Sequence, residues 1–262
     1  MKLGKKILCG IMTMSLAAVA LTGCGKEKDD KTFTVGFDAE YPPYGYMDDN
    51  GEYTGFDLEL AEAVCELNGW TLVKQPIEWA NKDNELNSGT IDCIWNGFTI
   101  NGREDDYEWS EPYVDNSQVI VVKADSGITS FEDLAGKTVA VQAASAALDV
   151  LTDEEAQKAL ADTFKTLQEF GDYNTAFLEL EAGSVDAIAM DIGVAQYQID
   201  SRGDEFIILE EHLNSEQYGI GFKLGNTELR DKVNESLHTL KENGTFDKLA
   251  EKYGLTDMIC FE

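Results

Sequence analysis

The side chains that could bind a small molecule lie in four short segments of the sequence. In the first, residues 38–44, two prolines restrict the backbone, while Tyr41 and Tyr44 offer flat apolar rings with a polar tip. Asp38 opens this segment directly after a run of strand-forming residues. An ordinary surface turn with two packed tyrosines would have the same sequence, so this segment alone does not identify a site.

The second segment, residues 96–103, combines a permissive backbone with groups that bind a carboxylate. Asn96 and Gly97 follow an apolar run, and a glycine lets the backbone come close to a ligand. Thr99 adds a hydroxyl, and Arg103 adds a planar guanidinium that can hold a carboxylate through two parallel hydrogen bonds. Acidic residues surround Arg103 along the chain, so a surface salt bridge is the competing interpretation.

The other two segments carry an acid and a strand-to-helix junction. Asp191 follows the apolar run 185–190 and opens a predicted helix, where an aspartate serves as an N-cap or as the partner of a ligand ammonium. Residues 142–145 join a predicted strand to a predicted helix, so their backbone N–H groups can bind an anion. Together the four segments supply what a zwitterion needs, namely donors for a carboxylate and acids for an ammonium.

Signatures of enzymes are missing from the sequence. It has no glycine-rich phosphate loop, no HExxH and no Gly-x-Ser-x-Gly turn, and its only histidines are His212 and His238. The sequence therefore offers almost no residues for a mechanism based on a histidine-activated nucleophile. No cysteine spacing suggests zinc. We expect no catalytic residues, no metal and no cofactor, and hence a protein that is not an enzyme.

Short strands alternate with helices along the chain, the pattern of an α/β protein. Apolar residues at helical spacing, for example Phe56, Leu60 and Val64, mark helices. Helices are predicted at 54–67, 80–86, 143–151, 153–161, 173–181, 192–201, 227–242 and 246–253, the last capped by Thr245, with a capping box at 130–133. Strands are predicted at 33–37, 71–73, 91–95, 118–122, 137–141, 166–170, 185–190, 206–209 and 218–222.

These elements form two βα units of similar size and a final segment too small to fold alone. We expect this final segment to return to the first unit, so that two crossing strands act as a hinge. The predicted lobe 1 is discontinuous and comprises residues 32–121 and 219–262, and lobe 2 comprises residues 122–218. Parallel sheets of α/β proteins bind ligands at the carboxyl ends of their strands, where the four segments lie.

The first 31 residues predict export and a lipid anchor. Three lysines precede an uncharged run that is too short for a comfortable membrane span, so residues 1–23 are interpreted as a signal peptide. The run ends in LTGC, which resembles a bacterial lipobox with Cys24 as the lipidated residue, and residues 24–31 form a polar tether. An ordinary signal peptide with a chance cysteine is the alternative.

The charge of the chain excludes some partners. The net charge is −30, and removing the three lysines of the first 23 residues leaves 17 basic against 50 acidic residues, or −33. Such a chain repels nucleic acid and anionic lipid surfaces, so we expect no nucleic-acid partner. Three cysteines would remain besides Cys24, which cannot all pair. Cys93 lies in an apolar run and is predicted to be a core residue, whereas Cys65 and Cys260 are a candidate disulfide outside the cytoplasm.

Longer segments of the sequence resemble the amino-acid-binding receptors of ABC importers, the polar-amino-acid group of bacterial solute-binding proteins. The resemblance covers residues 33–253 and rests on VGFDAEYPPYGY, GEYTGFDLELAEAV, SGTIDCIWNGFTINGRE, WSEPYV, FEDLAGKTVAVQ, AGSVDAIAMD, YGIGF and NGTFDKLAEKYG. It implies a two-lobed periplasmic-binding-protein-like fold of type II, in which each lobe is a βα sandwich and the lobes close on the ligand around two hinge strands.

The resemblance also implies roles for individual residues. Arg103 would clamp the α-carboxylate of an amino acid, helped by Thr99 and by the backbone at Ser145 and Ala146. Asp191 would pair with the α-ammonium. The full set of ligand-binding residues expected from the four segments and the resemblance is Asp38, Tyr41, Tyr44, Asp57, Trp79, Asn96, Gly97, Thr99, Arg103, Gln142, Ser145, Ala146, Asp191 and Tyr218.

The same resemblance assigns the ligand side chain to a different group of residues. Tyr41 and Trp79 would wrap it, and the backbone at Gly97 would assist at the ammonium. Its polar end would be met by Asp38, Asp57, Gln142 and Tyr218. Two departures from the family pattern concern the carboxylate end: the loop before Arg103 is one residue short, and Ala146 stands where the family often has a hydroxyl residue.

The function that follows is reception of a free amino acid for a membrane importer. The ligand is expected to be polar, such as glutamine, cystine or a basic amino acid. The protein would be a monomer, lipid-anchored at Cys24 on the outer face of the cell membrane, and would deliver its ligand to an ABC permease. An enzyme on the same fold, such as a dehydratase, and a sensory ligand-binding domain are the alternatives; fold alone does not exclude either.

Overall fold

The computed structural model describes residues 31–262, which form one compact unit. The expected signal peptide at residues 1–23, the lipidation of Cys24 and all of the tether except its last residue lie outside the described residues. Within residues 31–262, no helix has the length and apolar character needed to cross a bilayer.

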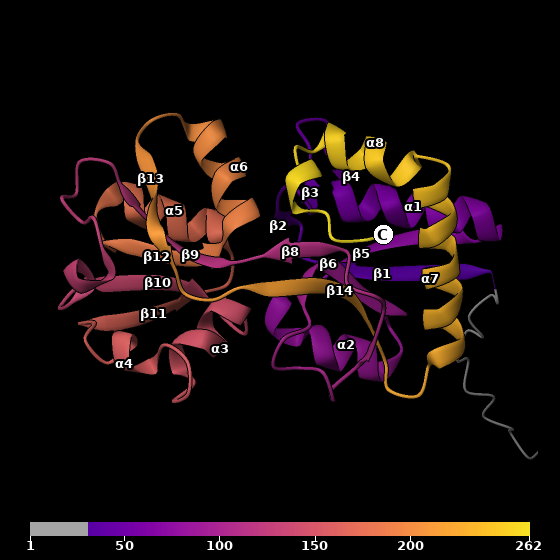
Figure 1. Ribbon diagram of the computed structural model, residues 1–262, viewed down its shortest axis with the longest axis horizontal. Helices are drawn as coiled ribbons and strands as arrows, with labels where there is room; N and C mark the ends of the chain where they lie inside the picture. The colour runs from indigo at the N-terminus through magenta and orange to yellow at the C-terminus, as the bar shows by residue number, and fades with distance from the viewer. Residues whose placement is uncertain (1–30) are drawn as a thin grey trace, which may run out of the picture. The chain divides into compact units, whose positions relative to one another are not determined.

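The first of two large sheets is built mainly from the N-terminal part of the chain (Figure 1). Its strand order is β5-β1-β6-β14-β7, with β8 also paired to β14. Strands β1, β5 and β6 run parallel, and β14 is antiparallel to β6. The bounds of these strands are β1 (Thr32–Phe37), β5 (Thr71–Pro76), β6 (Cys93–Thr99), β7 (Glu108–Trp109), β8 (Val114–Asn116) and β14 (Glu216–Phe222).

The second large sheet has the strand order β11-β10-β12-β9-β13. Its central strands are rich in Val, Ile and Ala and are buried on both faces, as is typical of strands covered by helices on each side. The bounds of its strands are β9 (Gln118–Lys123), β10 (Thr138–Gln142), β11 (Thr166–Phe170), β12 (Ala187–Asp191) and β13 (Phe206–His212). A small third sheet contains β2 (Glu40–Tyr41), β3 (Gly45–Met47) and β4 (Tyr53–Thr54).

Helices cover both large sheets. α1 packs against α7 and α8 beside the first sheet, whereas α3, α5 and α6 pack on the second (Figure 1). The α-helices are α1 (Phe56–Asn68), α2 (Lys82–Ser88), α3 (Ala146–Thr152), α4 (Lys158–Ala161), α5 (Tyr173–Ala182), α6 (Ile192–Arg202), α7 (Thr227–Glu242) and α8 (Thr245–Lys252). The 3-10 helices are η1 (Trp79–Asn81), η2 (Phe131–Leu134) and η3 (Thr256–Met258).

The C-terminal segment returns to the first sheet because one face of its long helix is apolar. In α7, Val233, Leu237 and Leu240 repeat at helical spacing and are buried. Full burial of such a side chain contributes about 1.5–3 kcal/mol, so this stripe is a substantial part of the contact with α1.

Two chain segments connect the sheets. β8 pairs with β14 in the first sheet, and the chain then passes directly into β9 of the second sheet. On the return, β13 of the second sheet leads into β14 of the first. Figure 1 shows β8 and β14 side by side between the two sheets. The two-lobed α/β architecture with two crossing strands is confirmed, while the lobe boundaries at residues 121/122 and 218/219 stay a prediction.

Several predicted elements differ from the observed ones in their bounds. β6 extends beyond the expected 91–95 to Thr99, because its far end pairs with β14. The helix predicted at 143–151 begins only at Ala146, since Ala144 has a φ of 55° and Ser145 caps the helix. The N-cap of α8 is Gly244, not Thr245.

The helix predicted at 153–161 is wrong over its first half, because α4 covers only the last turn of that range. The side chain of Asp153 accepts a hydrogen bond from the N–H of Glu155 at 2.9 Å. Such a local turn competes with the helical backbone hydrogen bonds.

The candidate disulfide between Cys65 and Cys260 is not formed, and both residues carry free thiols. Cys65 is buried on the inner face of α1, whereas the N–H of Cys260 donates to the carbonyl of Tyr113 near the C-terminus. Burial raises the pKa of Cys65 to about 12 and that of Cys260 to about 11, so neither is a thiolate at neutral pH. Cys93 is a buried core residue, as predicted.

Candidate functional site

A narrow cavity lies where the strand ends of the two sheets face each other. The space between its lining atoms is ≈ 270 Å³, but the centre of a water-sized sphere can move in only ≈ 10 Å³ of it. That is room for about one water molecule, so an amino acid can enter only if the cavity widens. The lining residues are Tyr41, Trp79, Asn96, Gly97, Thr99, Arg103, Gln142, Ser145, Ala146 and Asp191.

Every one of these lining residues was predicted from the sequence. They come from β2, η1, β6 and the loop after β6 on one side, and from the ends of β10 and β12 and the start of α3 on the other. The four predicted residues that do not line the cavity are Asp38, Tyr44, Asp57 and Tyr218. All four are buried next to lining residues and contact them, as described below.

Strand β6 brings Asn96, Gly97 and Thr99 to the cavity through an irregularity in its pairing. The register with β14 shifts between Gly219 and Gly221, and Gly97 has a φ of +57°. A Cβ on Gly97 would lie 3.0 Å from the rings of both Tyr218 and Tyr41. Glycine is therefore needed at this position for both its backbone conformation and its lack of a side chain.

Asp57 holds the backbone of Gly97 through a hydrogen bond outside the cavity. Its side chain is fully buried, and its Oδ2 accepts the N–H of Gly97 at 2.7 Å. The hydroxyl of Tyr113 donates to the same carboxylate at 2.9 Å. Burial raises the pKa of Asp57 to about 7 despite these hydrogen bonds. Asp57 thus holds the strand that lines the cavity and does not itself reach it.

Arg103 already has a partner within the protein. Its Nη2 lies 2.6 Å from Oδ2 of Asp149 on α3, and its guanidinium packs 5.3 Å from the ring centre of Phe98. The Arg103 side chain is 11% exposed, whereas that of Asp149 is 61% exposed. Arg103 therefore forms an ion pair and also lines the cavity, while its binding of a ligand carboxylate stays a prediction.

A second cation lies close to Arg103. Nζ of Lys82 donates to the carbonyl of Ala144 at 3.1 Å and lies 5.2 Å from the ring centre of Trp79. Burial, followed by repulsion from Arg103, lowers the pKa of Lys82 to about 8. This end of the cavity is therefore positive and suited to a carboxylate.

The acidic side of the cavity is formed by Asp191 at the end of β12. Its Oδ1 accepts three hydrogen bonds, from Nδ2 of Asn116 at 2.8 Å, Nε2 of Gln118 at 2.6 Å and the hydroxyl of Tyr218 at 2.6 Å. The side chain does not cap α6, although Asp191 is the residue at the N-cap position. Burial and the nearby Glu216 raise the pKa of Asp191 to about 6.

Aromatic rings form the wall between these charged groups. Tyr41 lies 6.0 Å from Tyr44 and 6.1 Å from Tyr173, and Tyr44 lies 5.3 Å from Tyr218, measured between ring centres. Trp79 packs edge-to-face on Phe98 at 5.5 Å. These rings offer apolar surface to the body of a ligand while their polar atoms stay near the acids.

Asp38 links the two sides of the cavity. Its Oδ2 accepts Nε2 of Gln142 at 2.6 Å, and its own N–H donates to Oδ1 of Asn96 at 2.7 Å. Burial raises the pKa of Asp38 to about 6. Asp38 also lines a neighbouring acidic cavity of ≈ 540 Å³ that shares Trp79 with the first.

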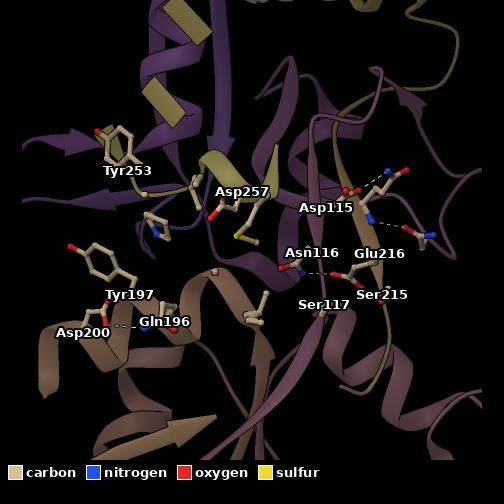
Figure 2. A pocket seen from close by; sticks show the side chains of 18 residues that line it. Asp115, Asn116, Ser117, Gln196, Tyr197, Asp200, Ser215, Glu216, Tyr253 and Asp257 are labelled. Atoms are coloured by element: carbon tan, nitrogen blue, oxygen red, sulfur yellow. Dashed lines mark hydrogen bonds between the residues drawn. The ribbon is translucent and has the colours of Figure 1, made fainter. Parts of the chain in front are cut away.

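A larger cavity of ≈ 950 Å³ adjoins the crossing segments (Figure 2). Its lining includes Asn116 and Glu216 from these segments, Tyr197 from α6, and Tyr253 and Asp257 near the C-terminus. None of the predicted ligand-binding residues lines this cavity. It is open and mixed in character, whereas the narrow cavity brings a cationic and an acidic group together.

Sequence reasoning missed the polar residues at the crossing, chiefly Asn116, Gln118 and Glu216. All three are buried and hydrogen-bonded to one another or to Asp191. Polar residues that flank an apolar strand were a usable signal at Gln118, whereas Glu216 was placed in a loop because the predicted strand began at residue 218. Within the described residues, no group of three or more His, Cys, Asp or Glu side chains could hold a metal ion.

Comparison with known proteins adds to this geometry. Residues 33–256 match the model of a family described as bacterial extracellular solute-binding proteins, family 3. The L-cystine-binding protein TcyJ of Escherichia coli (strain K12) is 28% identical over 261 residues, which is 96% of each chain.

Similar solved structures also include amino-acid-binding proteins. A substrate-binding protein of an ABC uptake transporter from Streptococcus pneumoniae, determined with bound histidine, is 33% identical with a TM-score of 0.83, covering 88% of this chain and 95% of that one. An ancestral amino-acid-binding protein described as a precursor of cyclohexadienyl dehydratase is 32% identical with a TM-score of 0.77, covering 85% and 95%.

Proposed function

Because this chain belongs to family 3 of the bacterial extracellular solute-binding proteins, we propose that it binds a free amino acid for an ABC importer. The single observation that supports this best is the narrow cavity, which places Arg103 and Asp191 in one small lining with aromatic rings. A guanidinium beside a buried carboxylate is complementary to the two charges of a zwitterion.

In this proposal the ligand carboxylate binds Arg103 and the ligand ammonium binds Asp191. Arg103 has five N–H donors, so its pairing with Asp149 through Nη2 leaves others for a ligand. Thr99 requires a different role from the one that the family resemblance implied. Its hydroxyl donates to Oε1 of Glu216 at 2.8 Å, so in this arrangement its side chain accepts a hydrogen bond from a ligand.

The lobes must separate and close again for the ligand to enter. Polar contacts that bridge the two sides of the cavity include Arg103 with Asp149, Lys82 with the carbonyl of Ala144, Gln142 with Asp38, and Tyr218 with Asp191. Contacts of this kind can be exchanged for contacts with water, and two crossing strands can absorb a hinge motion. A ligand that is held by both lobes would favour the closed arrangement.

We expect the amino acid to be polar, with glutamine, cystine and the basic amino acids as the first candidates. Tyr41 and Trp79 provide apolar surface, and beyond Trp79 lies the acidic cavity lined by Asp38. A side chain with an apolar stem and a hydrogen-bonding or cationic tip fits this sequence of surfaces.

The family is extracytoplasmic, and we infer that this chain is attached to the outer face of the cell membrane through a lipid on Cys24. The LTGC sequence and the polar residues after it support the anchor. Delivery to a membrane permease as a monomer completes the proposal. Metabolic labelling with a fatty acid, lost on Cys24→Ala, tests the anchor.

An enzyme is the second candidate, because a buried acid whose pKa is raised to about 6 is a common feature of catalytic sites. In this chain Oδ1 of Asp191 is already saturated by three donors, which suits a fixed counter-charge better than a proton shuttle. Following each bound amino acid by NMR over hours separates the two, since a receptor returns its ligand unchanged.

The test of the proposed function is a thermal-shift screen of the protein against the common amino acids. A ligand at about 100 times its dissociation constant stabilises the folded state by about 2.7 kcal/mol, which raises the midpoint by several degrees. Arg103→Ala should abolish the shift. If no amino acid raises the midpoint, or if Arg103→Ala keeps it, the proposal is wrong.

A further inference from the structure

Glu216 is a buried acid for which the ligand contacts proposed above give no role. It lies at the start of β14 and is only 4% exposed. Its Oε1 accepts hydrogen bonds at 2.8 Å from Oγ1 of Thr99, Nδ2 of Asn116 and Nε2 of Gln118. Its Oε2 accepts Nδ2 of Asn214 at 2.9 Å. All four donors are neutral groups, so they form hydrogen bonds to the carboxylate of Glu216 but do not compensate its negative charge.

Asp191 depends on two of the same donors. Nδ2 of Asn116 and Nε2 of Gln118 each donate to Oδ1 of Asp191 as well as to Oε1 of Glu216. Figure 2 shows the bond that joins Asn116 to Glu216 between the crossing segments. Two carboxamides therefore bridge two carboxylates, and the four side chains form one unit across both crossing segments.

The orientation of the carboxamides fits two ionised acids. Both amide nitrogens face the carboxylates, and the oxygens Oδ1 of Asn116 and Oε1 of Gln118 are buried without a hydrogen-bond partner. If one acid were protonated, its O–H would be a donor and an amide oxygen would be the natural acceptor. Instead, the amide nitrogens of both Asn116 and Gln118 donate only to the two carboxylates.

No basic side chain among residues 31–262 neutralises this pair. The two cations at the cavity are engaged elsewhere, Arg103 with Asp149 and Lys82 with the carbonyl of Ala144. A buried charge without a counter-ion is unfavourable. A cation that enters the cavity on the side of Asp191 would therefore stabilise these two carboxylates electrostatically.

We propose that Glu216 is a positioning residue for the ligand ammonium: it supplies a second negative charge behind Asp191 and accepts the hydrogen bond that the Thr99 hydroxyl donates, so that both lining residues present acceptors to one ammonium. This inference rests on the proposed function. It also ties the ammonium to both crossing segments, because Asn116 precedes β9, Gln118 begins it and Glu216 begins β14.

The proposal gives a signature that a purely structural role would not. Burial is the largest cause that raises the pKa of Asp191, and the negative charge of Glu216 is the second. The other titratable groups that face Asp191 are the hydroxyls of Tyr41, Tyr44, Tyr173 and Tyr218. They are neutral at physiological pH, since their ordinary pKa is 10.0 and burial raises it further. Removing the charge of Glu216 should therefore lower the pKa of Asp191.

The experiment is isothermal titration of the purified protein with L-arginine, L-histidine and L-glutamine between pH 5 and pH 8. For each probe that binds the wild type, Glu216→Gln should weaken binding at pH 7.5 by about tenfold or more. The affinity of the wild type should fall below about pH 6 as Asp191 is protonated. In Glu216→Gln this fall should move to lower pH, while Glu216→Asp should keep the pH profile of the wild type.

Unliganded stability separates positioning from folding. Glu216→Gln removes a buried charge, so its melting midpoint should equal or exceed that of the wild type. Glu210→Gln, on the exposed side of β13, is the matched control and should change neither affinity nor pH profile. An unchanged affinity and pH profile for Glu216→Gln, or a loss of affinity that accompanies a lowered midpoint, overturns the inference. Failure of the wild type to bind these probes or any other common amino acid would instead overturn the proposed function on which it rests.

Discussion

Arg103 and Asp191 are the two residues on which ligand binding depends in the proposed function, and each has a protein partner of a different kind. Asp149, the partner of Arg103, has a side chain that is 61% exposed, and an ion pair with an exposed acid contributes about 0–1 kcal/mol. A ligand carboxylate can therefore compete for Arg103. The partners of Asp191 are buried amides and a tyrosine, which stay in place when a ligand binds.

Replacing the guanidinium by an ammonium tests the carboxylate end. Arg103→Lys keeps the charge but loses the planar fork, so the dissociation constant for an amino acid should rise by about tenfold or more. Asp149→Asn should change it by less than about fivefold, because the pair with Asp149 is exposed. Isothermal titration measures both values.

Arg202→Lys is the matched control for this comparison. Arg202 also forms an ion pair, with Glu181, and packs on an aromatic ring, Phe177, but it lies outside the cavity. The dissociation constant of the Arg202→Lys variant for the amino acid should equal that of the wild type. Equal affinity of Arg103→Lys and the wild type would contradict the assigned role of Arg103.

The lining of the cavity was largely predictable from the sequence, because polar residues directly after apolar strands lie at the ligand-binding edge of a parallel sheet. Arg103, Asp191 and Gln142 were found in this way. Asn116 and Glu216 were not, since their contact joins residues 100 positions apart. Such a pair is created by the antiparallel crossing of β8 and β14, and no local pattern contains it.

At the scale of elements, the irregular end of β6 determines the shape of the cavity. A regular strand would pair residue by residue with β14, whereas the register shift near Gly97 turns its neighbours toward the cavity. The predicted strand ended at residue 95, and glycine is unfavourable within strands. Pairing with β14 outweighs this preference and extends the strand to Thr99.

A pair of glycine substitutions tests this role of β6. Gly97 and Gly102 have φ values of +57° and +80°, so alanine at either position is strained by roughly 1–2 kcal/mol. Only at Gly97 would the new Cβ meet other atoms, the rings of Tyr41 and Tyr218 at 3.0 Å, whereas nothing lies within 4 Å at Gly102. Gly97→Ala should therefore destabilise more and also weaken ligand binding.

Urea unfolding and titration calorimetry measure the two effects separately. Gly102→Ala is the control, since it carries the same backbone cost without the contacts. We expect its affinity for an amino acid to match that of the wild type. If the two variants behaved alike, the close approach of Tyr41 and Tyr218 to Gly97 would have no functional importance.

At the scale of the whole molecule, the two sheets share a cavity that has several buried acids in its lining or directly behind it. Asp38, Asp57 and Asp191 have pKa values raised to about 6, 7 and 6 from an ordinary value of 3.8, chiefly by burial. An acid whose pKa is higher in the folded state binds more protons when folded, over the pH range between its two pKa values. Ionisation of these acids therefore opposes folding.

We expect the stability of the ligand-free protein to fall as the pH rises from 5 to about 7.5. Above that pH these acids are ionised in both states and their effect is constant. Melting midpoints measured in high salt, which screens the large net charge, test this. Asp57→Asn should flatten the slope between pH 6 and pH 7.5, and a midpoint that rises over the same range would contradict the burial of these charges.

The central claim, that one cavity recognises both charges of a free amino acid, is tested most directly by calorimetry with blocked ligands. The best-binding amino acid is compared with its N-acetyl derivative, which lacks the ammonium, and with its carboxamide, which lacks the carboxylate. We predict that each derivative binds about 100-fold more weakly or worse, since each leaves Asp191 or Arg103 unpaired. Equal binding of either derivative, or no binding of any amino acid at millimolar concentration, would contradict the account.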